Sequence, residues 1–544
     1  MAYSASVLSK MLLIVGGLLL ATEGCYSPGD ATSEATEADP DEITGANAVA
    51  RTLTVQGYVY VEPTASAATI LEAVRRQTRT MFGPLRNLRI GLDDREVRSV
   101  DPQTFRRENV SVVDVDHRGV AARPMVRVRY SYSDRAVVTT DLASRRSIAT
   151  TALFSNYAPY ASDVIRDCTD DPEAEEFGAS GLWYMFNPAV SRCQRLVRAE
   201  VAAIDADSRR LTDRATQVST REVSRRFLPV TATLRTIRQP TTPRYPEYDR
   251  LFGARDVNKT DLNVYAFFGV IGEREDDVTD EGYLEMMHVL QQLLRTYPGL
   301  RIVGTEPAGN VLDVRVNNAV VPNATLANVV QWAITGRVPS NFSSSSVRTA
   351  IATLWRRRAV QVQLPMTVTS GSTTHPLNLN VFVYYGDEGS AWSADAHERY
   401  VRAWRDADVF IYSGHSHLGS GPLDPANYRM SDFPDRYQIM MINSCVSYNY
   451  YNTDFYALHP GGTRNLDMIV NGTEALGDNG HAVSALILGL VNGRQQNYLE
   501  LMQSMVATVS SLGLYQYDPL RVADGELDNT YRPSRTPITL RAAR

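Results

Sequence analysis

The last third of the chain alternates apolar runs with helical segments, and this alternation restricts the possible folds more than any other feature. The apolar runs are "LNLNVFVYYG" (377–386), "DVFIYSG" (408–414), "YQIMMINS" (437–444) and "LDMIVNG" (466–472), and helical spacing covers 393–407 and 479–493. Strands that are apolar throughout are buried on both faces, and helices between them indicate a parallel sheet with helices on each side. We therefore expect an α/β/α sandwich with a mostly parallel sheet.

Two reactive side chains come directly after two of these runs. His415 follows the run at 408–414, and Cys445 follows the run at 437–444. In parallel sheets the functional groups lie beyond the carboxyl ends of the strands, and neighbouring strands are about 4.8 Å apart. A histidine close to a cysteine can accept its proton and leave the nucleophilic thiolate. The sequence therefore predicts a cysteine–histidine pair, and Asn443 or Asp408 are candidates to orient the imidazole.

The chain is long enough for several domains. At 544 residues it exceeds the usual size of one domain. Residues 51–250 combine alternating strands with helical segments, including a long helix at 190–225, and predict an α+β domain. "RQPTTPRYPEY" (238–248) is rich in proline and favours a linker. We expect an α/β connecting region at 251–360 and the sandwich domain at 361–544.

The first residues have the pattern of an export signal. Lys10 precedes "MLLIVGGLLLA", an apolar stretch of 11 residues. A bilayer span needs about 20 residues, whereas a signal peptide needs only a short apolar core. Cys25 resembles the lipid-modified cysteine of bacterial lipoproteins, although Thr22 and Glu23 depart from the usual pattern. Residues 1–25 are therefore expected to be a signal peptide, of lipoprotein type or for simple secretion.

The next segment and the overall charge add to this picture. Residues 26–50 are acidic with few large apolar side chains, which predicts a disordered tether. The net charge of -6 gives no basic surface for nucleic acid, so that class of partner is excluded. We expect an exported protein of the periplasm or the outer membrane, attached to the membrane through a lipid on Cys25.

The four cysteines can be assigned by their positions. Cys168 and Cys193 lie 25 positions apart in one segment, and an exported protein can keep a disulfide there. Cys25 is the candidate for lipidation. Cys445 is left without a partner, which marks it as a candidate reactive thiol.

The order of these motifs resembles that of the caspase–gingipain–legumain superfamily of cysteine peptidases. In that superfamily an apolar strand runs into a His-Gly pair, and a later strand runs into a small residue followed by the catalytic cysteine. "VFIYSGHS" and "IMMINSC" match in order, and the strand and helix in "LDMIVNGTEALGDNGHAVSALILGL" follow as in the gingipain-like branch. The resemblance covers roughly residues 375–495.

The resemblance implies a caspase-like fold and an exported endopeptidase that needs no cofactor. Cys445 is then the nucleophile and His415 the general base and acid, with a peptide or protein as substrate. The backbone N–H groups of Ser416 and Cys445 are then the oxyanion donors. Ser416 stands where the family has glycine, and a serine is excluded from some backbone conformations that glycine adopts.

Other interpretations of the same residues remain open. His417 is an alternative base, and Asp454, in the tyrosine-rich run "YNYYNTDFY" (448–456), is a candidate for a substrate pocket. That run is also explained as a packed loop. A zinc site could use His415, His417 and Cys445 with His459 or His481, although no HExxH or CxxC motif accompanies them. A surface lipoprotein that keeps a degenerate peptidase fold for binding is the remaining alternative.

Overall fold

The computed structural model of the chain describes residues 43–542 apart from 95–96, 118, 172–173, 238–241, 255, 273–278, 307–314, 317–318, 321–325, 336, 338–358, 387–393, 476, 478–479 and 511–517. The signal segment 1–25, with Cys25, and residues 26–42 of the expected tether lie outside the described residues. The chain divides into two compact units. Unit 1 comprises Met1–Ala46, Pro240–Ser447 and Tyr451–Arg544, and unit 2 comprises Asn47–Gln239 and Tyr448–Tyr450.

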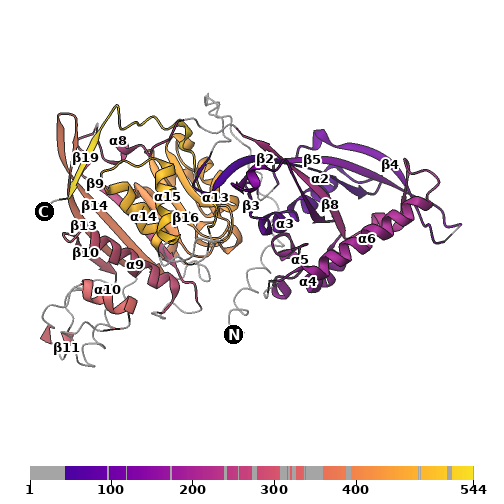
Figure 1. Cartoon of the computed structure of the whole chain (residues 1–544), viewed down its shortest axis with the longest axis horizontal. Coiled ribbons are helices and arrows are strands. Elements are labelled where there is room, and N and C mark those ends of the chain that lie inside the picture. Colours follow the sequence, from indigo (N-terminus) through magenta and orange to yellow (C-terminus); the bar gives the residue numbers. More distant parts are fainter. Residues whose placement is uncertain are drawn as a thin grey trace. The chain divides into compact units, whose positions relative to one another are not determined.

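Unit 1 is built on sheet A, a sheet of 10 strands (Figure 1). Its order is β1 (Thr44–Gly45), β18 (Arg521–Asp524), β17 (Leu466–Asn471), β16 (Gln438–Asn443), β15 (Val409–Ser413), β9 (Asp261–Gly269), β14 (Thr373–Gly386), β13 (Ala359–Ser370) and β10 (Arg301–Glu306), with β19 (Ile538–Ala542) also paired to β13. A separate pair joins β11 (Arg315–Val316) to β12 (Ala319–Val320). Residues 251–360 thus supply β9 and β10 to the same sheet as residues 361–544.

Sheet A is parallel only in its centre. The pairings β14–β9, β9–β15, β15–β16 and β16–β17 are parallel, whereas the other described pairings of this sheet are antiparallel. The expectation of a mostly parallel sheet is therefore wrong for the margins, because β13 and β14 form a long hairpin and β18 returns alongside β17. The parallel strands end together at what we call the carboxyl edge, and begin together at the amino edge.

The helices of unit 1 are α8 (Tyr248–Leu251), α9 (Glu281–Thr296), α10 (Leu326–Thr335), α12 (Ala394–Asp406), α13 (Ser447–Leu458, of which Tyr448–Tyr450 are grouped with unit 2), α14 (His481–Val491) and α15 (Tyr498–Ser510). The alternating side chains of β15 show that helices cover both faces of the sheet. Ile411 belongs to one core with residues of α9, α14 and α15. Phe410 points to the other face and packs on Trp404 of α12, with ring centroids 3.8 Å apart. The mixed α/β fold expected from the sequence is present.

The residues of β15, β16 and β17 explain why these strands lie in the centre. Every residue of these three strands is buried, which matches the apolar residues that fill most of their length. By contrast, β13 alternates between buried and half-buried side chains, as a strand at a margin does. The tyrosine-rich run, which we considered as a loop, forms most of helix α13.

Unit 2 is built on sheet B, a curled mixed sheet. Its strands are β6 (Ser147–Leu153), β8 (Phe227–Thr236), β2 (Ala48–Val61), β5 (Arg123–Thr139), β4 (Arg106–Val113) and β7 (Gln217–Ser219) in that order, with β3 (Ile90–Leu92) paired to β5. Its helices are α2 (Ala67–Arg79), α3 (Phe82–Asn87), α4 (Ala161–Cys168), α5 (Ala174–Met185), α6 (Ser191–Arg210) and α7 (Thr220–Val223). Residues 44–45 and 48–50, at the end of the expected tether, belong to β1 and β2.

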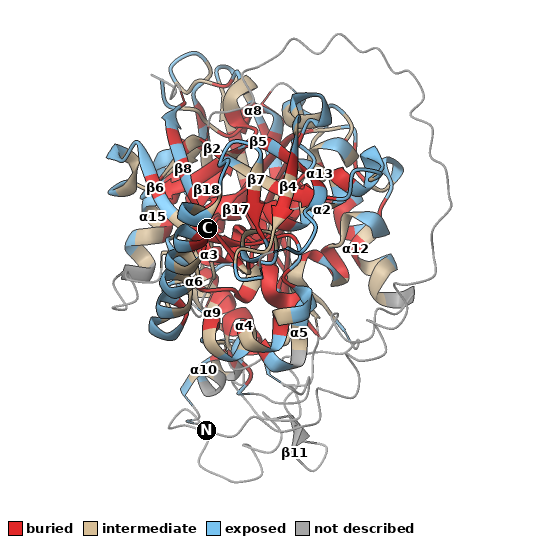
Figure 2. Ribbon diagram, turned by 90° about the vertical axis from the view of Figure 1, so that its right-hand side faces the viewer, coloured by how far each residue is buried: buried red, intermediate tan, exposed pale blue. Residues whose placement is uncertain are grey.

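The helix expected at 190–225 ends at Arg210, and β7 and α7 follow it. In Figure 2 helix α6 is mostly tan and pale blue, in keeping with its few buried residues. One of these, Cys193, forms the predicted disulfide with Cys168 of α4, which is confirmed. The disulfide lies within a small buried cluster that also contains Leu153 and Phe186.

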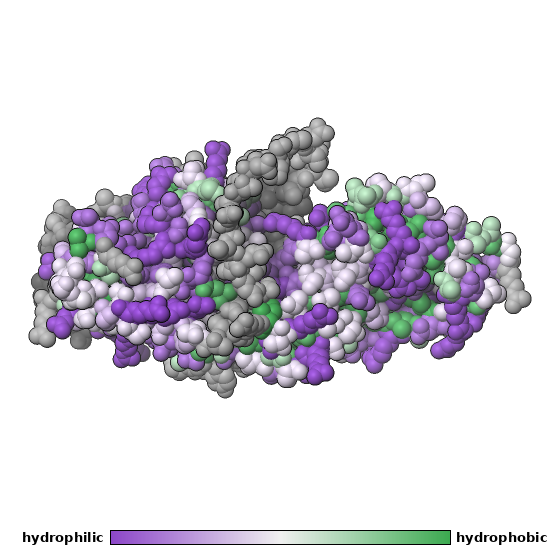
Figure 3. Space-filling view, turned by 90° about the horizontal axis from the view of Figure 1, so that it is seen from above, coloured by the Kyte–Doolittle hydropathy of each residue, from purple (hydrophilic) through white to green (hydrophobic). Residues whose placement is uncertain are grey.

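The molecular surface is polar over most of the face shown in Figure 3, with small separate hydrophobic areas. The exposed large apolar side chains of the described residues are dispersed along the sequence, and are Leu88, Val120, Val257, Val303, Met430 and Leu499. None of the described helices combines the length and the apolar character that crossing a membrane requires.

Candidate active site

The strand register places His415 and Cys445 at equivalent positions on neighbouring strands. β15 and β16 are parallel, and Ser413, the last residue of β15, is paired with Asn443, the last residue of β16. Each reactive residue lies two positions beyond its member of this pair. The carbonyl of Asn443 also accepts from the amide of Gly414 at 3.4 Å, so the segments that follow β15 and β16 remain hydrogen-bonded just beyond the strands. The two residues are therefore at the same distance along the chain from the paired ends of their strands, at the carboxyl edge.

Cys445 lies on a tight turn between β16 and α13. Val446, directly after it, is fully buried and has a φ of 54°, a left-handed conformation that β-branched residues rarely adopt. Ser447 then begins α13, so the thiol stands just before the N-terminus of a 12-residue helix. The half-buried thiol donates to the carbonyl of Ala475 at 3.5 Å. A helix N-terminus favours negative charge, and a thiolate at this place is stabilised.

The imidazole of His415 is held by a backbone carbonyl. Its Nε2 lies 3.3 Å from the carbonyl oxygen of Ile271, which follows β9. A carbonyl only accepts hydrogen bonds, so this contact requires the proton on Nε2 and leaves Nδ1 with a free lone pair in the neutral ring. The carbonyl of His415 itself accepts from the hydroxyl of Tyr412 at 2.8 Å. The exposed imidazole is thus oriented as a base.

The two reactive groups have partners on opposite sides. The partner of His415 belongs to the loop after β9, on one side of β15, whereas the partner of Cys445 belongs to the loop after β17, on the far side of β16. Proton transfer from thiol to imidazole therefore requires the thiol to leave the carbonyl of Ala475. Free enzymes often hold such groups loosely and bring them together when substrate binds.

Ser416 adopts an ordinary backbone conformation. Its φ of −81° and ψ of −13° are accessible to any residue, so this position does not require the glycine of the resembling family. The left-handed conformation instead falls on His417 and Leu418, with φ values of 49° and 55°. The carbonyl of Ser416 accepts from the hydroxyl of Tyr451 in α13 at 2.6 Å, and this hydrogen bond attaches the loop after β15 to α13. Strained backbone of this kind collects at functional sites.

The other candidate residues have diverse positions. The ring of His417 lies 5.8 Å from that of His415, centroid to centroid, and its side chain is half-buried. Asp454 is in the second turn of α13, about 10 Å along the axis from the start of the helix. His459 follows the far end of α13, is buried, and contacts the carbonyl of Pro460. Burial lowers the pKa of His459 to about 4.

The zinc alternative gains no support from these positions. His481 is the first residue of α14, and its ring lies near that of His288 in α9. Within the described part of the chain, no three histidine, cysteine or acidic residues are grouped so that they could hold a metal ion.

A buried polar network underlies the carboxyl edge, and its first half connects α9 with β15 and β16. The carboxylate of Glu285 in α9 is 4% exposed and accepts from the hydroxyl of Ser413 at 2.6 Å. The same hydroxyl accepts from the side-chain amide of Asn443 at 3.1 Å. Glu285 thus fixes the ends of both reactive strands from one helix.

The second half of the network reaches the peptide that precedes Cys445. Arg521, 6% exposed at the start of β18, donates to the side-chain oxygens of Asn443 at 2.7 Å and Asn471 at 3.2 Å. The amide of Asn471 in turn donates to the carbonyl of Ser444 at 3.1 Å. The buried guanidinium group of Arg521 is therefore linked through Asn471 to Ser444, the residue before Cys445.

Several residues that build this edge were not identified from the sequence. The partner of His415 is the carbonyl of Ile271, not Asn443 or Asp408. Asp408 lies at the amino edge, where it pairs with Lys259 at 2.6 Å and Arg436 at 3.5 Å. A backbone carbonyl has no sequence signature, so no motif could have revealed Ile271. Glu285 could have been identified from the sequence, because it is an acidic residue in the buried stripe of an amphipathic helix and a buried carboxylate needs a hydrogen-bond partner.

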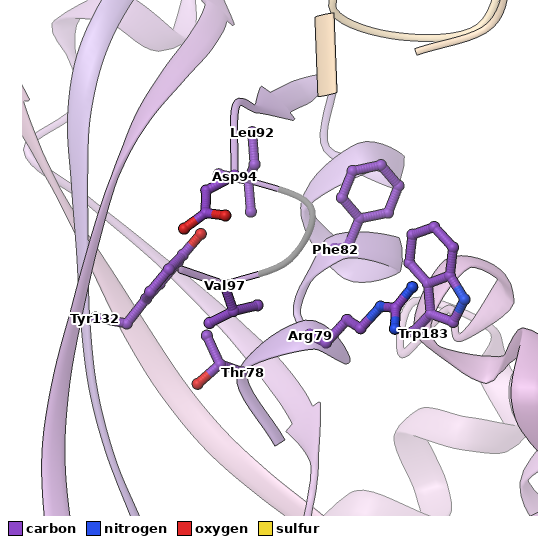
Figure 4. A pocket seen from close by; sticks show the side chains of 8 residues that line it. All are labelled: Thr78, Arg79, Phe82, Leu92, Asp94, Val97, Tyr132 and Trp183. Atoms are coloured by element: carbon purple, nitrogen blue, oxygen red, sulfur yellow. The ribbon is translucent and has the colours of Figure 1, made fainter. Parts of the chain in front are cut away.

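Two cavities among the described residues lie away from this pair of side chains. A cavity of unit 2, lined by residues such as Asp94, Tyr132 and Trp183, measures about 10 Å³, enough for one water molecule (Figure 4). A pocket of about 400 Å³ opens at the amino edge of sheet A beside Lys259 and Asp528. Neither includes His415 or Cys445.

Comparisons of this chain with protein-family models, with curated proteins and with solved structures find no match. The function is therefore argued from the geometry of the carboxyl edge.

Proposed function

We propose that this protein is an exported cysteine endopeptidase with a Cys445–His415 dyad on a caspase-like domain. One observation carries the proposal. The parallel register of β15 and β16 brings a histidine and the one cysteine without a disulfide among the described residues to equivalent positions on adjacent strands. The strained turns after both strands, and the helix that begins after Cys445, support the same conclusion.

The reaction follows from these groups. Nδ1 of His415 takes the thiol proton, and the Cys445 sulfur attacks the carbonyl carbon of the scissile peptide bond. The negative charge that forms on the carbonyl oxygen is stabilised by the backbone N–H groups of Ser416 and Cys445. The imidazolium returns the proton to the leaving amine as the C–N bond breaks. Water, deprotonated by His415, then hydrolyses the thioester and restores the thiol.

Ser416 supports this assignment although the resembling family has glycine there. Its backbone angles lie in the ordinary right-handed region, so its N–H can be placed without a conformation reserved for glycine. The hydrogen bond from Tyr451 to its carbonyl holds that peptide group in position. An oxyanion donor of this type needs a fixed backbone more than a particular side chain.

The location of the protein belongs to the same proposal. The Cys168–Cys193 disulfide favours an oxidising compartment, as expected for an exported protein. A lipid on Cys25 would attach the protein to a membrane, with peptides or proteins of the periplasm or cell surface as substrates.

The experiment is alkylation of the full-length protein with an iodoacetamide probe, with mass spectrometry to locate the labelled cysteine. We expect rapid labelling of Cys445, and labelling slowed at least about 100-fold in His415→Ala. His117→Ala, an exposed histidine of unit 2, is the matched control and should label like the natural protein. Labelling of Cys445 that is equally fast without His415, or that needs a chelator, contradicts the dyad.

One observation favours a second candidate, a non-catalytic binding protein that keeps this fold. The thiol and the imidazole each have a backbone carbonyl as partner, on opposite sides of the strand pair. If that arrangement is permanent, Cys445 stays slow to alkylate and a mixed peptide library is not cleaved. Cleavage of the library that is lost in Cys445→Ala excludes this candidate.

A further inference from the structure

One peptide group lies between a buried carboxylate and the imidazole of His415. Its carbonyl end is the oxygen of Ile271, 3.3 Å from His415 Nε2. Its amide end is the N–H of Gly272, which donates to Oδ2 of Asp280 at 2.5 Å. A peptide group is planar and rigid, so the carboxylate and the imidazole are joined through a single stiff unit.

Asp280 is itself firmly held. It is 5% exposed, and it also accepts from the amides of Ile271 at 3.0 Å and Gly282 at 2.9 Å. The second of these contacts makes it the N-cap of α9, a helix of 16 residues. The carboxylate therefore binds the loop after β9 and the first turn of α9 together.

The first turn of α9 fits tightly against the end of β9. A Cβ atom at Gly282 would lie 1.9 Å from the carbonyl oxygen of Gly269, the last residue of β9. No larger residue fits there unless the backbone moves. The position of Asp280 relative to the carboxyl edge is thus set by backbone packing.

We propose that Asp280 is a positioning residue that acts on His415 through the Ile271–Gly272 peptide. Negative charge on its carboxylate polarises that peptide and makes the Ile271 carbonyl a stronger acceptor, since hydrogen bonds in a chain reinforce one another. The stronger acceptor keeps the imidazole proton on Nε2 and Nδ1 bare, and it stabilises the imidazolium formed during catalysis. A catalytic triad obtains the same result from direct contact between carboxylate and histidine.

This inference rests on the proposed function, and it differs from a capping role alone. Asparagine caps helices as well as aspartate does, because both offer a side-chain oxygen to the first free amides. The substitution Asp280→Asn therefore retains an oxygen for the cap of α9, but it removes the charge and replaces the oxygen that accepts from the amides of Ile271 and Gly272 by an NH2 group, which only donates. An effect of that substitution on His415 is an effect of the lost interaction with the Ile271–Gly272 peptide, not of helix capping.

The first test is a nitrogen-15 NMR spectrum of the histidine rings in the full chain. It is recorded at a pH well above the range in which histidines ordinarily titrate, so that the rings are neutral. In the natural protein we expect His415 to carry its proton on Nε2. In Asp280→Asn the signals should move toward a mixture of the two tautomers. Asp280→Ser, which also keeps a capping oxygen, is measured beside it in case the first variant folds poorly. An unchanged His415 signal in the folded variants overturns the proposal.

The second test is the rate of Cys445 alkylation in the same variants. We expect about a tenfold decrease in Asp280→Asn and no further decrease when Asp280→Asn is added to His415→Ala. The matched control is Asn497→Ala, because Asn497 is a buried capping residue that accepts from the amide of Glu500 at 2.9 Å far from the histidine in sequence. It should change neither the tautomer nor the rate.

The two proposals fail in different ways. If alkylation of Cys445 does not depend on His415, the peptidase proposal fails, and the tautomer measurement still decides whether Asp280 acts on the imidazole. If alkylation depends on His415 but neither the rate nor the tautomer changes in Asp280→Asn, the dyad stands and the role of Asp280 is limited to the helix cap.

Discussion

The two edges of sheet A differ in which residues adopt the left-handed backbone conformation. At the amino edge it falls on Gly461 and Gly525, which adopt it at little cost, and on Gln495. At the carboxyl edge it falls on Gly419 and Gly421 and also on His417, Leu418 and Val446, where it costs about 1–3 kcal/mol at each residue. The carboxyl edge therefore carries more strained residues, and they lie beside its reactive groups.

The buried polar groups of the two edges differ in the same way. At the amino edge, Asp467 is fully buried and accepts from Tyr437, Tyr498 and Asn529. At the carboxyl edge, the network of buried side chains includes Ser413 and reaches the carbonyl of Ser444, close in sequence to His415 and Cys445, which are exposed and half-buried. Substitutions at the amino edge should thus change stability, and substitutions at the carboxyl edge should change reactivity.

The largest effect is expected from Asp467→Ala. It removes the acceptor that three buried donors share. Tyr437 and Tyr498 keep only their contact with each other, and Asn529 keeps only the carbonyl of Tyr245, so we expect a cost of about 3 kcal/mol in the free energy of unfolding. Urea denaturation measures this loss, and Tyr437→Phe, which removes a single donor, should cost about 1 kcal/mol. The alkylation rate of Cys445 in the folded variant should stay unchanged. A stable Asp467→Ala protein with a slow Cys445 would reverse the proposed division between the edges.

A smaller effect is a dependence of stability on pH. Burial raises the pKa of Asp467 to about 7, although its hydrogen-bond donors oppose this. Because the folded state binds this proton more tightly than the unfolded state, the stabilisation is complete below the unfolded pKa of about 4 and is lost as the pH rises toward 7. The slope is at most about 1.4 kcal/mol per pH unit. Denaturation at a series of pH values should show a flatter curve for Asp467→Asn; an identical curve contradicts the assignment.

Gly525→Ala is expected to cost about 2 kcal/mol, because the left-handed φ of 87° is strained for alanine. The added Cβ would also lie 2.7 Å from the carbonyl oxygen of Leu466. Thermal and urea denaturation measure the loss. Gly119→Ala, with a φ of 99° but open space around it, is the control that isolates the clash, and an equal cost at both positions would show that the clash contributes nothing.

The smallest effect on stability is expected from Leu418→Gly at the carboxyl edge. Relief of the left-handed strain and the added freedom of glycine in the unfolded chain nearly cancel, so the unfolding free energy should change by less than about 1 kcal/mol. The loop that carries His415 becomes looser, and alkylation of Cys445 should slow about threefold. A large loss of stability without a change in rate would show that the strain has no connection with the reactive pair.

The central strands could be predicted from sequence because burial on both faces leaves a continuous apolar signature. β14, β15, β16 and β17 were all expected within a few residues of their bounds. The long strand β5 of sheet B could not be predicted in the same way. It runs without a break through "SYSDR" (131–135), a polar segment typical of a turn, because Asp134 is buried there and accepts from Tyr132 and from the amide of Asp94. Such distant contacts have no local pattern.

For the candidate site, sequence identified the side chains and the structure supplied their surroundings. His415 and Cys445 were chosen because each follows an apolar run, and a strand order cannot be read from such runs alone. The Tyr451 contact was missed because α13 has buried tyrosines on several sides and no clear apolar stripe. Ile271 contacts His415 through its backbone carbonyl, and every residue type has that group, so its sequence gives no signal.

The short strand β1 has a consequence for how this chain matures. Thr44 is paired with Ala523, about 480 positions later, so the ends of this loop meet only at a large cost in chain entropy. Synthesis delivers β1 first and its partner β18 almost last. Until then, the outer side of β17 presents unpaired amides and carbonyls that can recruit strands from other chains. Sheet A is therefore most exposed to aggregation during the interval before its last segment arrives, and truncation before Arg521 would make that interval permanent.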